Sequence, residues 1–358
     1  MAKPLRYYFV SPMLNRPVGG QNVLIWLAET LRQKGYATAP LYPEAYFRYS
    51  FEPFNGESFF SHTLRDAIRP KGRKWLKHRM HLLMSPRNNH PNIRWQASEQ
   101  DVFVIPEFMY PQCVNAFKPA HCILVAQDVF GLARAFTRDQ MSNAPQYSYF
   151  SSVLTTSKAS SEAVNTLLGR DSHRLQLPVC RKGLEYCSAK KLQIAYMPRK
   201  RPGERAMIIA GLKAQSSLAD IPIISIENMT NKERNCVISE SLVFLSFSEK
   251  EGFGLPPAEA MATGSIVIGY TGVGGDEYFT CETGIPVPDS DIVSFIRSVE
   301  HIIARYRKDP APLDALRQSA SRLIWERYSE TKAQQSAIAT WNKLDTEIRE
   351  KARCEILT

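Results

Sequence analysis

The sequence has no apolar stretch long enough to cross a membrane. Its uninterrupted apolar runs, such as Ala206–Ala210 and Leu242–Leu245, have the length of β-strands. No h-region of a secretory signal follows the start of the chain, where Met1–Arg6 leads directly into a predicted strand. Low-complexity tracts and short repeats are also lacking, and 44% of the residues are apolar. We therefore expect a soluble globular protein.

Cysteine is scarce and has no paired spacing. The seven cysteines are an odd number and include no C-x-x-C pair, which argues against a disulfide framework and against structural zinc. We expect free thiols at Cys180 and Cys187 in particular. The sequence therefore predicts a cytoplasmic protein.

The charge is unevenly distributed. The 358 residues carry a net charge of +10 and are numerous enough for two domains. Between Arg65 and Arg94 there are nine Lys or Arg against one acid, Asp66, a net of +8. Such a local basic patch indicates a local anionic partner.

Two interpretations of this basic segment stay open. Leu76, Met80 and Leu83 have helical spacing within it, and a segment rich in aromatics, residues 42–62, precedes it. A basic amphipathic helix beside exposed aromatics suits an anionic membrane surface, so one prediction is peripheral binding to the inner face of a membrane. The other is a solvated helix that lines an acceptor site or binds a phosphorylated glycan. No nucleic-acid partner is expected, because the segment matches no known module.

The most informative stretch begins with an apolar strand at Leu242–Phe247. A glycine-bearing loop follows, Pro256-Pro257 open a short helix, and residues 265–270 read as the next buried strand. The amino end of such a helix has free N–H groups and is a ready anion site.

Two carboxylates frame this anion site. Glu259 lies in the first turn of the predicted helix, where it can accept two hydrogen bonds from a vicinal diol such as a ribose. Glu251 lies at the carboxyl end of the strand, the usual ligand edge of an open α/β sheet. A diol site, a phosphate site and a polar group for a reacting sugar together describe a nucleotide sugar.

Residues 251–259, E-G-F-G-L-P-P-A-E, resemble the E-x7-E signature of retaining GT-B glycosyltransferases. The resemblance implies that Glu259 holds the donor ribose and that Glu251 lies near the transferred sugar. It also implies contacts of the intervening backbone with sugar and phosphate, at Gly252, Phe253, Gly254 and Leu255. The other interpretation is a Rossmann-like turn whose glycines only allow tight packing.

The resemblance implies an α/β fold of the GT-B type, with two Rossmann-like domains that face each other across a cleft. We place an acceptor domain at residues 1–185, with its last strand at 175–179 and a basic and aromatic insertion at about 42–95. The donor domain would span residues 186–358, and its last helices would cross back to the first domain.

The family places an Arg and a Lys after the first strand of the donor domain, where they neutralise the donor diphosphate. Here that strand is followed by Met197–Arg205, and a helix is expected to begin at Met207. Arg199 matches the Arg, whereas Lys200, Arg201 and Arg205 compete for the second cation; we select Arg199 and Lys200, with Glu251, as catalytic. No acidic D-x-D cluster is evident, and the resemblance implies that no metal or other cofactor is needed.

Further site residues also follow from the resemblance. Met229 precedes the capping-box pattern Thr230-x-x-Glu233 and would contact the base, while Gly274 and Gly275 form a second glycine-rich helix start. On the acceptor side lie two pairs of neighbouring residues. These are Gly19 and Gly20, in a turn before a helix expected at 23–34, and Gln127 and Asp128, after a strand expected at 122–126. Relatives often have His at position 127, so a proton-transfer role there is in doubt; the two glycines could also serve only the turn.

The function implied is transfer of a hexose from a nucleotide diphosphate sugar to a glycan or lipid-linked acceptor, with retention, in surface polysaccharide or glycoconjugate biosynthesis. Two alternatives stay open. A sugar-nucleotide epimerase shares the fold and would convert the donor without an acceptor. A non-catalytic nucleotide-sugar-binding protein would keep the fold with a worn site, and fold alone does not distinguish them.

Overall fold

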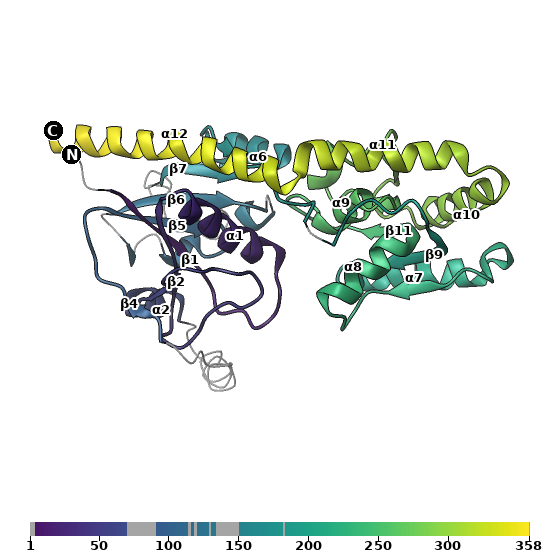
Figure 1. Cartoon of the computed structure of the whole chain (residues 1–358), viewed down its shortest axis with the longest axis horizontal. Coiled ribbons are helices and arrows are strands. Elements are labelled where there is room, and N and C mark those ends of the chain that lie inside the picture. Colours follow the sequence, from purple (N-terminus) through teal and green to yellow (C-terminus); the bar gives the residue numbers. More distant parts are fainter. Residues whose placement is uncertain are drawn as a thin grey trace. The chain divides into compact units, whose positions relative to one another are not determined.

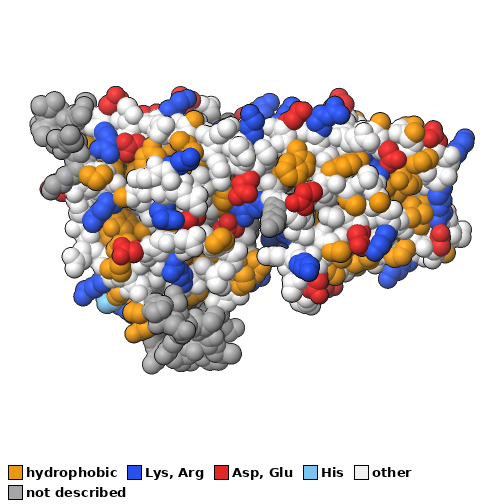
Figure 2. Space-filling model, viewed as in Figure 1, with side chains coloured by type: hydrophobic (Ala, Val, Ile, Leu, Met, Phe, Trp, Pro, Cys, Tyr) orange, Lys and Arg blue, Asp and Glu red, His pale blue; other side chains and the backbone are white. Residues whose placement is uncertain are grey.

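The structure is a computed structural model that describes residues 4–69, 91–113, 116–117, 120–128, 130–133, 150–181 and 183–357. The chain forms two compact units, each with its own parallel sheet (Figure 1). The first unit comprises residues 1–156, 160–175 and 334–358, and the second comprises 157–159 and 176–333. On the face seen in Figure 2, acidic and basic side chains are interspersed over the described surface.

The first unit contains an eight-stranded sheet in the order β4-β3-β2-β1-β5-β6-β7-β8, with parallel pairings throughout. Its strands are β1 (Arg6–Val10), β2 (Ala37–Tyr42), β3 (Phe59–Phe60), β4 (Ile93–Arg94), β5 (Asp101–Pro106), β6 (His121–Ala126), β7 (Phe150–Thr155) and β8 (His173–Arg174). Its helices include α1 (Gly19–Gln33), α2 (His62–Ile68), α4 (Tyr110–Cys113) and most of α6 (Lys158–Leu168). Both β5 and β7 are buried along their full length, as expected for strands covered on both faces.

One strand expected in this unit is absent. Residues 175–179 were predicted as a strand, but β8 ends at Arg174 and these five residues form no strand. Pro178 has no N–H to donate to a ladder. The N–H groups of Val179 and Cys180 donate instead to the carbonyl of Tyr328, at 3.0 and 3.1 Å.

The expectation of exposed aromatics after β2 is wrong for most of them. Only two are exposed, Tyr46 by 52% and Phe51 by 39%. The buried ones are Tyr42, Phe47, Tyr49 and Phe54. The loop is held against α1, because the hydroxyl of Tyr49 accepts a hydrogen bond from the Val18 N–H and donates to Asn22. The predicted basic helix around Leu76 to Leu83 lies outside the described residues.

The second unit has a five-stranded parallel sheet in the order β10-β9-β11-β12-β13. Its strands are β9 (Lys191–Tyr196), β10 (Ile223–Ser225), β11 (Ser241–Phe247), β12 (Ile266–Tyr270) and β13 (Ile285–Pro286). Its helices include α7 (Pro202–Ala214), η3 (Ser216–Leu218), α8 (Asn231–Glu240), α9 (Leu255–Ala262), η4 (Gly274–Glu277), α10 (Ile292–Lys308) and α11 (Ala311–Tyr328). The strand–loop–helix–strand unit predicted from Leu242 to Tyr270 is confirmed as β11, α9 and β12.

Gly264 ends α9 because only glycine fits there. Its φ of +85° is in the left-handed region, and a Cβ atom at this position would lie 2.5 Å from the ring of Tyr186. The chain can therefore turn directly from α9 into β12.

The last helix, α12 (Glu330–Leu357), begins in the second unit, and from Gln334 onward it belongs to the first. The fully buried Trp341 packs against Tyr7 and Phe9, and the Tyr7 hydroxyl donates to Asp345 at 2.6 Å. The contacts thus assign residues 176–333 to the second unit, whereas the boundary predicted from the sequence lies at 185/186. The acceptor and donor roles of the two units stay predictions.

Candidate functional site

The glycine-rich loops of the second unit lie at one edge of its sheet. Because β9, β11 and β12 are neighbouring parallel strands, the loops after Tyr196, Phe247 and Tyr270 all leave from the carboxyl edge. The loops after β11 and β12 are joined by two backbone hydrogen bonds. The Glu251 N–H donates to the Gly272 carbonyl at 2.9 Å, and the Gly274 N–H donates to the Glu251 carbonyl at 3.1 Å.

The structure brings together the three residues predicted as catalytic. The carboxylate of Glu251, 19% exposed, lies 3.7 Å from the Arg199 guanidinium and 3.5 Å from the Lys200 ammonium group. Arg199 is 61% exposed, and Lys200 also donates to the carbonyl of Glu249 at 3.0 Å. Two cations thus flank one carboxylate at the edge where a ligand is expected.

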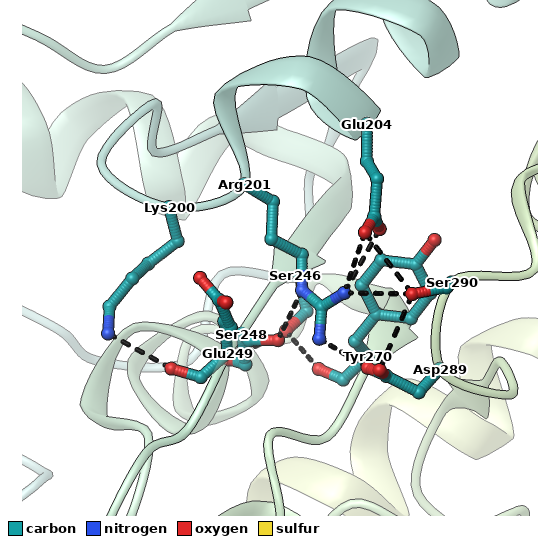
Figure 3. Close-up of polar contacts among 9 residues, drawn as sticks. All are labelled: Lys200, Arg201, Glu204, Ser246, Ser248, Glu249, Tyr270, Asp289 and Ser290. Atoms are coloured by element: carbon teal, nitrogen blue, oxygen red, sulfur yellow. Dashed lines mark hydrogen bonds and ion pairs between the residues drawn. The ribbon is translucent and has the colours of Figure 1, made fainter.

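The competing cations are engaged elsewhere. The Arg201 guanidinium is only 8% exposed and binds the carboxylates of Glu204 and Asp289 (Figure 3). Arg205 lies inside α7 and donates to the carbonyls of Pro198 and Lys200. The helix expected to begin near Met207 begins five residues earlier, because Pro202 suits the first helical position. Of the candidate pairs, Arg199 with Lys200 is therefore the one that remains available to a ligand at the carboxyl edge of the sheet.

The amino end of α9 has fewer donors than a helix normally offers. An α-helix leaves the N–H groups of its N-cap and first three residues without intrahelical partners. Here the second and third of these helical residues are Pro256 and Pro257, so only Gly254 and Leu255 carry such an N–H. Gly254 has a φ of +84°, and its carbonyl and that of Phe253 accept hydrogen bonds from the hydroxyl of Tyr278. Both donors belong to the predicted phosphate-binding backbone.

The second glycine-rich turn packs against the first without space for a side chain. A Cβ atom at Gly274 would lie 2.3 Å from the backbone of Gly252, whereas one at Gly275 would meet nothing closer than 3.5 Å. The preceding residue, Val273, has a φ of +75°, which strains a β-branched residue. The predicted helix start is observed as a short 3-10 helix, η4.

Glu259 is the second carboxylate of the motif. It was expected in the first turn of its helix, but α9 already begins at Leu255, so Glu259 lies in the second turn. Its carboxylate, 14% exposed, is 3.4 Å from the guanidinium of Arg234 on α8. Burial raises the pKa of Glu259, and the charges of Arg234 and Arg181 partly offset this shift. Arg234 was not predicted as a site residue, although it follows directly after the confirmed capping box at Thr230 and Glu233. Met229, half-buried, lies in the loop between β10 and α8 at the same edge.

In the first unit the predicted acceptor-side residues also lie together. The Gln127 side chain donates to the Gly20 carbonyl at 3.1 Å, and the Gln127 N–H donates to the carboxylate of the buried Glu107 at 3.1 Å. Asp128 accepts a hydrogen bond from the N–H of Phe130. Gly19 and Gly20 were expected in a turn, but α1 begins at Gly19, so both belong to its first turn. Glu107, directly after β5, was not predicted as a site residue.

Two kinds of feature are absent from the described part of the chain. Within it, no group of three or more His, Cys, Asp or Glu side chains is arranged to hold a metal ion. None of its helices is both long and apolar enough to span a bilayer. All six cysteines whose side chains are described have free thiols, Cys180 and Cys187 included.

The sequence is similar to a known glycosyltransferase over about half of the chain. No family model matches the chain. It is 28% identical over 181 residues to an alpha-1,6-glucosyltransferase of Actinobacillus pleuropneumoniae serotype 7, and the match spans 49% of this chain and 54% of that relative, about half of its length.

Solved structures match over nearly the whole chain. HepE of Anabaena, in complex with UDP and glucose, covers 95% of this chain and 100% of its own at a TM-score of 0.63 and 13% identity. The pneumococcal O-GlcNAc transferase GtfA, in complex with UDP and GlcNAc, covers 97% and 99% at a TM-score of 0.62 and 9% identity. Identities this low show the fold alone. The chain therefore has the α/β fold of the GT-B glycosyltransferases.

Proposed function

We propose that this protein is a glycosyltransferase that transfers a hexose from a UDP-sugar to a glycan or lipid-linked acceptor. The observation that carries the proposal is the set of charged groups at one sheet edge. Arg199 and Lys200 flank Glu251, and Glu259 lies on α9, the helix that follows the loop carrying Glu251.

The positions of these charged groups suit the diphosphate and the ribose of a UDP-sugar. The cations Arg199 and Lys200, with the N–H groups of Gly254 and Leu255, would bind the diphosphate and stabilise its charge as the bond to the sugar C1 atom breaks. Glu259, paired with Arg234, would accept hydrogen bonds from the ribose diol. Glu251 would then lie beside the transferred sugar.

The relatives support the choice of donor. HepE and GtfA are both seen with UDP, and the curated relative is named a glucosyltransferase. We further propose retention of the anomeric configuration, no requirement for a metal or other cofactor, and a role in surface polysaccharide or glycoconjugate synthesis. Contact of residues 65–94 with an anionic membrane surface belongs to the same proposal.

The experiment is a thermal-shift panel of nucleotides and nucleotide sugars on the wild type and Glu259→Gln, followed by measurement of UDP release with candidate acceptors. A ligand that binds only the folded state raises Tm with its concentration. We expect a shift with UDP and UDP-sugars that the variant reduces, and UDP release that depends on acceptor. Conversion of the donor without acceptor would instead indicate an epimerase. Binding without any turnover would indicate a non-catalytic binding protein, and no shift with any nucleotide would contradict the proposal.

A further inference from the structure

The guanidinium of Arg201 is enclosed at the carboxyl edge of the second sheet. Its Nε group donates to the Ser248 carbonyl at 3.1 Å, and its Nη1 group binds the Glu204 carboxylate at 3.0 and 3.1 Å. Nη2 pairs with Asp289, and the guanidinium carbon lies 4.5 Å from the ring centre of Tyr270. Two carboxylates on one cation leave a local excess of negative charge, so a diphosphate would be repelled from Arg201 rather than bound by it.

These contacts join loops that are far apart in the sequence. Ser248 belongs to the loop after β11, Tyr270 ends β12, and Asp289 precedes α10. The neighbouring Lys200 reaches in another direction, to the Glu249 carbonyl (Figure 3). Arg201 and Lys200 therefore tie the loop after β9 to adjacent residues, Ser248 and Glu249, of the loop that carries Glu251.

The backbone at Arg201 is itself strained. Its φ of +47° and ψ of +56° place it in the left-handed region at the N-cap of α7. Such a conformation costs an L-residue energy and persists where the surroundings over-determine it. The side-chain contacts of Arg201 supply this constraint, and the turn is what separates the direction of Lys200 from that of α7.

We propose that Arg201 is a positioning residue that holds Lys200 against Glu251; this inference rests on the proposed function. Arg201 does not touch the reacting groups. It fixes the loop from which Lys200 extends, so that the charge of Lys200 meets the leaving diphosphate without reorganisation. The alternative is a purely structural role, in which Arg201 stabilises the unit but has no bearing on Lys200.

A double-mutant cycle on turnover separates the two roles. The variants are Arg201→Gln, Lys200→Met and the double variant, with kcat and the donor KM measured for each. We expect Arg201→Gln to lower kcat by roughly 10- to 30-fold while KM changes less than about threefold, because placement in the transition state is lost. The double variant should be within about threefold of Lys200→Met alone, because residues acting as a unit are non-additive. Costs that multiply in the double variant, or a rise in KM alone, would overturn the proposal.

A second readout does not depend on any enzymatic activity. The rate at which acetic anhydride acetylates the Lys200 amine is measured by mass spectrometry in the wild type, Arg201→Gln and Arg201→Lys. We expect Arg201→Gln to raise the rate at Lys200 several-fold, and Arg201→Lys, which keeps the charge but not the fork of donors, to raise it less. An unchanged rate in both variants would contradict the positioning role even if the wild type transferred no sugar.

The matched control is Arg317→Gln. The Arg317 side chain is 1% exposed, against 8% for Arg201, and likewise binds a carboxylate, Asp314, and backbone carbonyls, those of Gly264 and Cys187. These carbonyls precede β12 and β9, at the opposite edge of the sheet. The control should therefore lower Tm while the acetylation rate of Lys200 stays as in the wild type. An equal rise in the control would mean that loss of stability alone explains the effect.

Discussion

The Glu259 carboxylate lies 3.4 Å from the Arg234 guanidinium, although 25 residues separate the two in the chain. Arg234 extends from α8 and Glu259 from α9, and these helices pack on each other. Burial raises the pKa of Glu259 and Arg234 opposes this shift, so the arginine helps to keep the carboxylate ionised and able to accept hydrogen bonds.

This pair predicts how nucleotide binding depends on pH. Falling pH protonates Glu259, which removes an acceptor from the ribose diol, so the Kd for UDP should rise as the pH falls. In Arg234→Gln the pKa of Glu259 rises further, and the loss of binding should begin at higher pH than in the wild type. Glu259→Gln should bind UDP about 10- to 100-fold more weakly at neutral pH, because hydrogen bonds to a charged group contribute roughly 1.5–3 kcal/mol. Calorimetric titrations between pH 5 and pH 8 test this; the same pH profile in Arg234→Gln and the wild type would contradict it.

Arg199→Ala should mainly slow turnover. Loss of a charge that stabilises the leaving group lowers kcat, by about 100-fold for one such group, with a smaller effect on the donor KM. The measurement is steady-state UDP release. Arg307→Ala is a suitable control. Arg307 lies in the last turn of α10 and pairs with Asp220, so the kinetics of this variant should match those of the wild type. Unchanged kcat in Arg199→Ala would remove this residue from the site.

Gly274→Ala should disrupt nucleotide binding more than Gly275→Ala. The added methyl group at residue 274 would lie 2.3 Å from the backbone of Gly252, so the two loops would have to separate. At residue 275 the nearest atom is 3.5 Å away, which is an ordinary contact. Affinity for UDP, measured by calorimetry, should fall at least about tenfold in the first variant, an energy of about 1.4 kcal/mol. Equal affinities would show that the loop contact has no bearing on binding.

Alanine at Gly264 should destabilise the second unit through two separate effects. Gly264 has both a positive φ and a Cβ position 2.5 Å from Tyr186, whereas Gly35 has a φ of +91° with nothing within 4 Å. Gly203, in the first turn of α7, has neither restriction. Urea unfolding should therefore show a loss of about 1 kcal/mol for Gly35→Ala, a larger loss for Gly264→Ala, and little change or a gain for Gly203→Ala. Equal losses at Gly35 and Gly264 would exclude the steric contribution.

Lys190 should make stability depend on pH. Its ammonium group donates to the Ser239 carbonyl, and burial lowers the pKa of Lys190 from 10.5 to about 7, with a further contribution from the Arg317 charge. Between pH 7 and pH 10.5 the unfolded chain therefore holds a proton that the folded protein has released, so stability rises with pH in this window and is flat below it.

The comparison variant is Lys190→Met. Because the side chain is only partly buried, we expect the wild type to gain roughly 1 kcal/mol relative to this variant between pH 7.5 and pH 9. Urea unfolding at both pH values measures the difference. A stability difference that does not change with pH would show that the folded-state pKa of Lys190 is ordinary.

The sequence by itself determined the local units of this fold. Proline and glycine bounded α9, the Thr230–Glu233 capping box started α8, and apolar runs marked the buried strands, because caps and periodicity are set by residues close in the chain. The short strand expected at 175–179 is not formed; the N–H group of its last residue, Val179, donates to the carbonyl of Tyr328, about 150 residues later. Tertiary structure likewise decided which two of four neighbouring cations remain available to a ligand at the sheet edge: Arg201 is engaged by Glu204 and Asp289, and Arg205 by backbone carbonyls. Partners such as Arg234 and Glu259 come from different helices, so their pairing depends on the order of strands in the sheet, which local pattern does not specify.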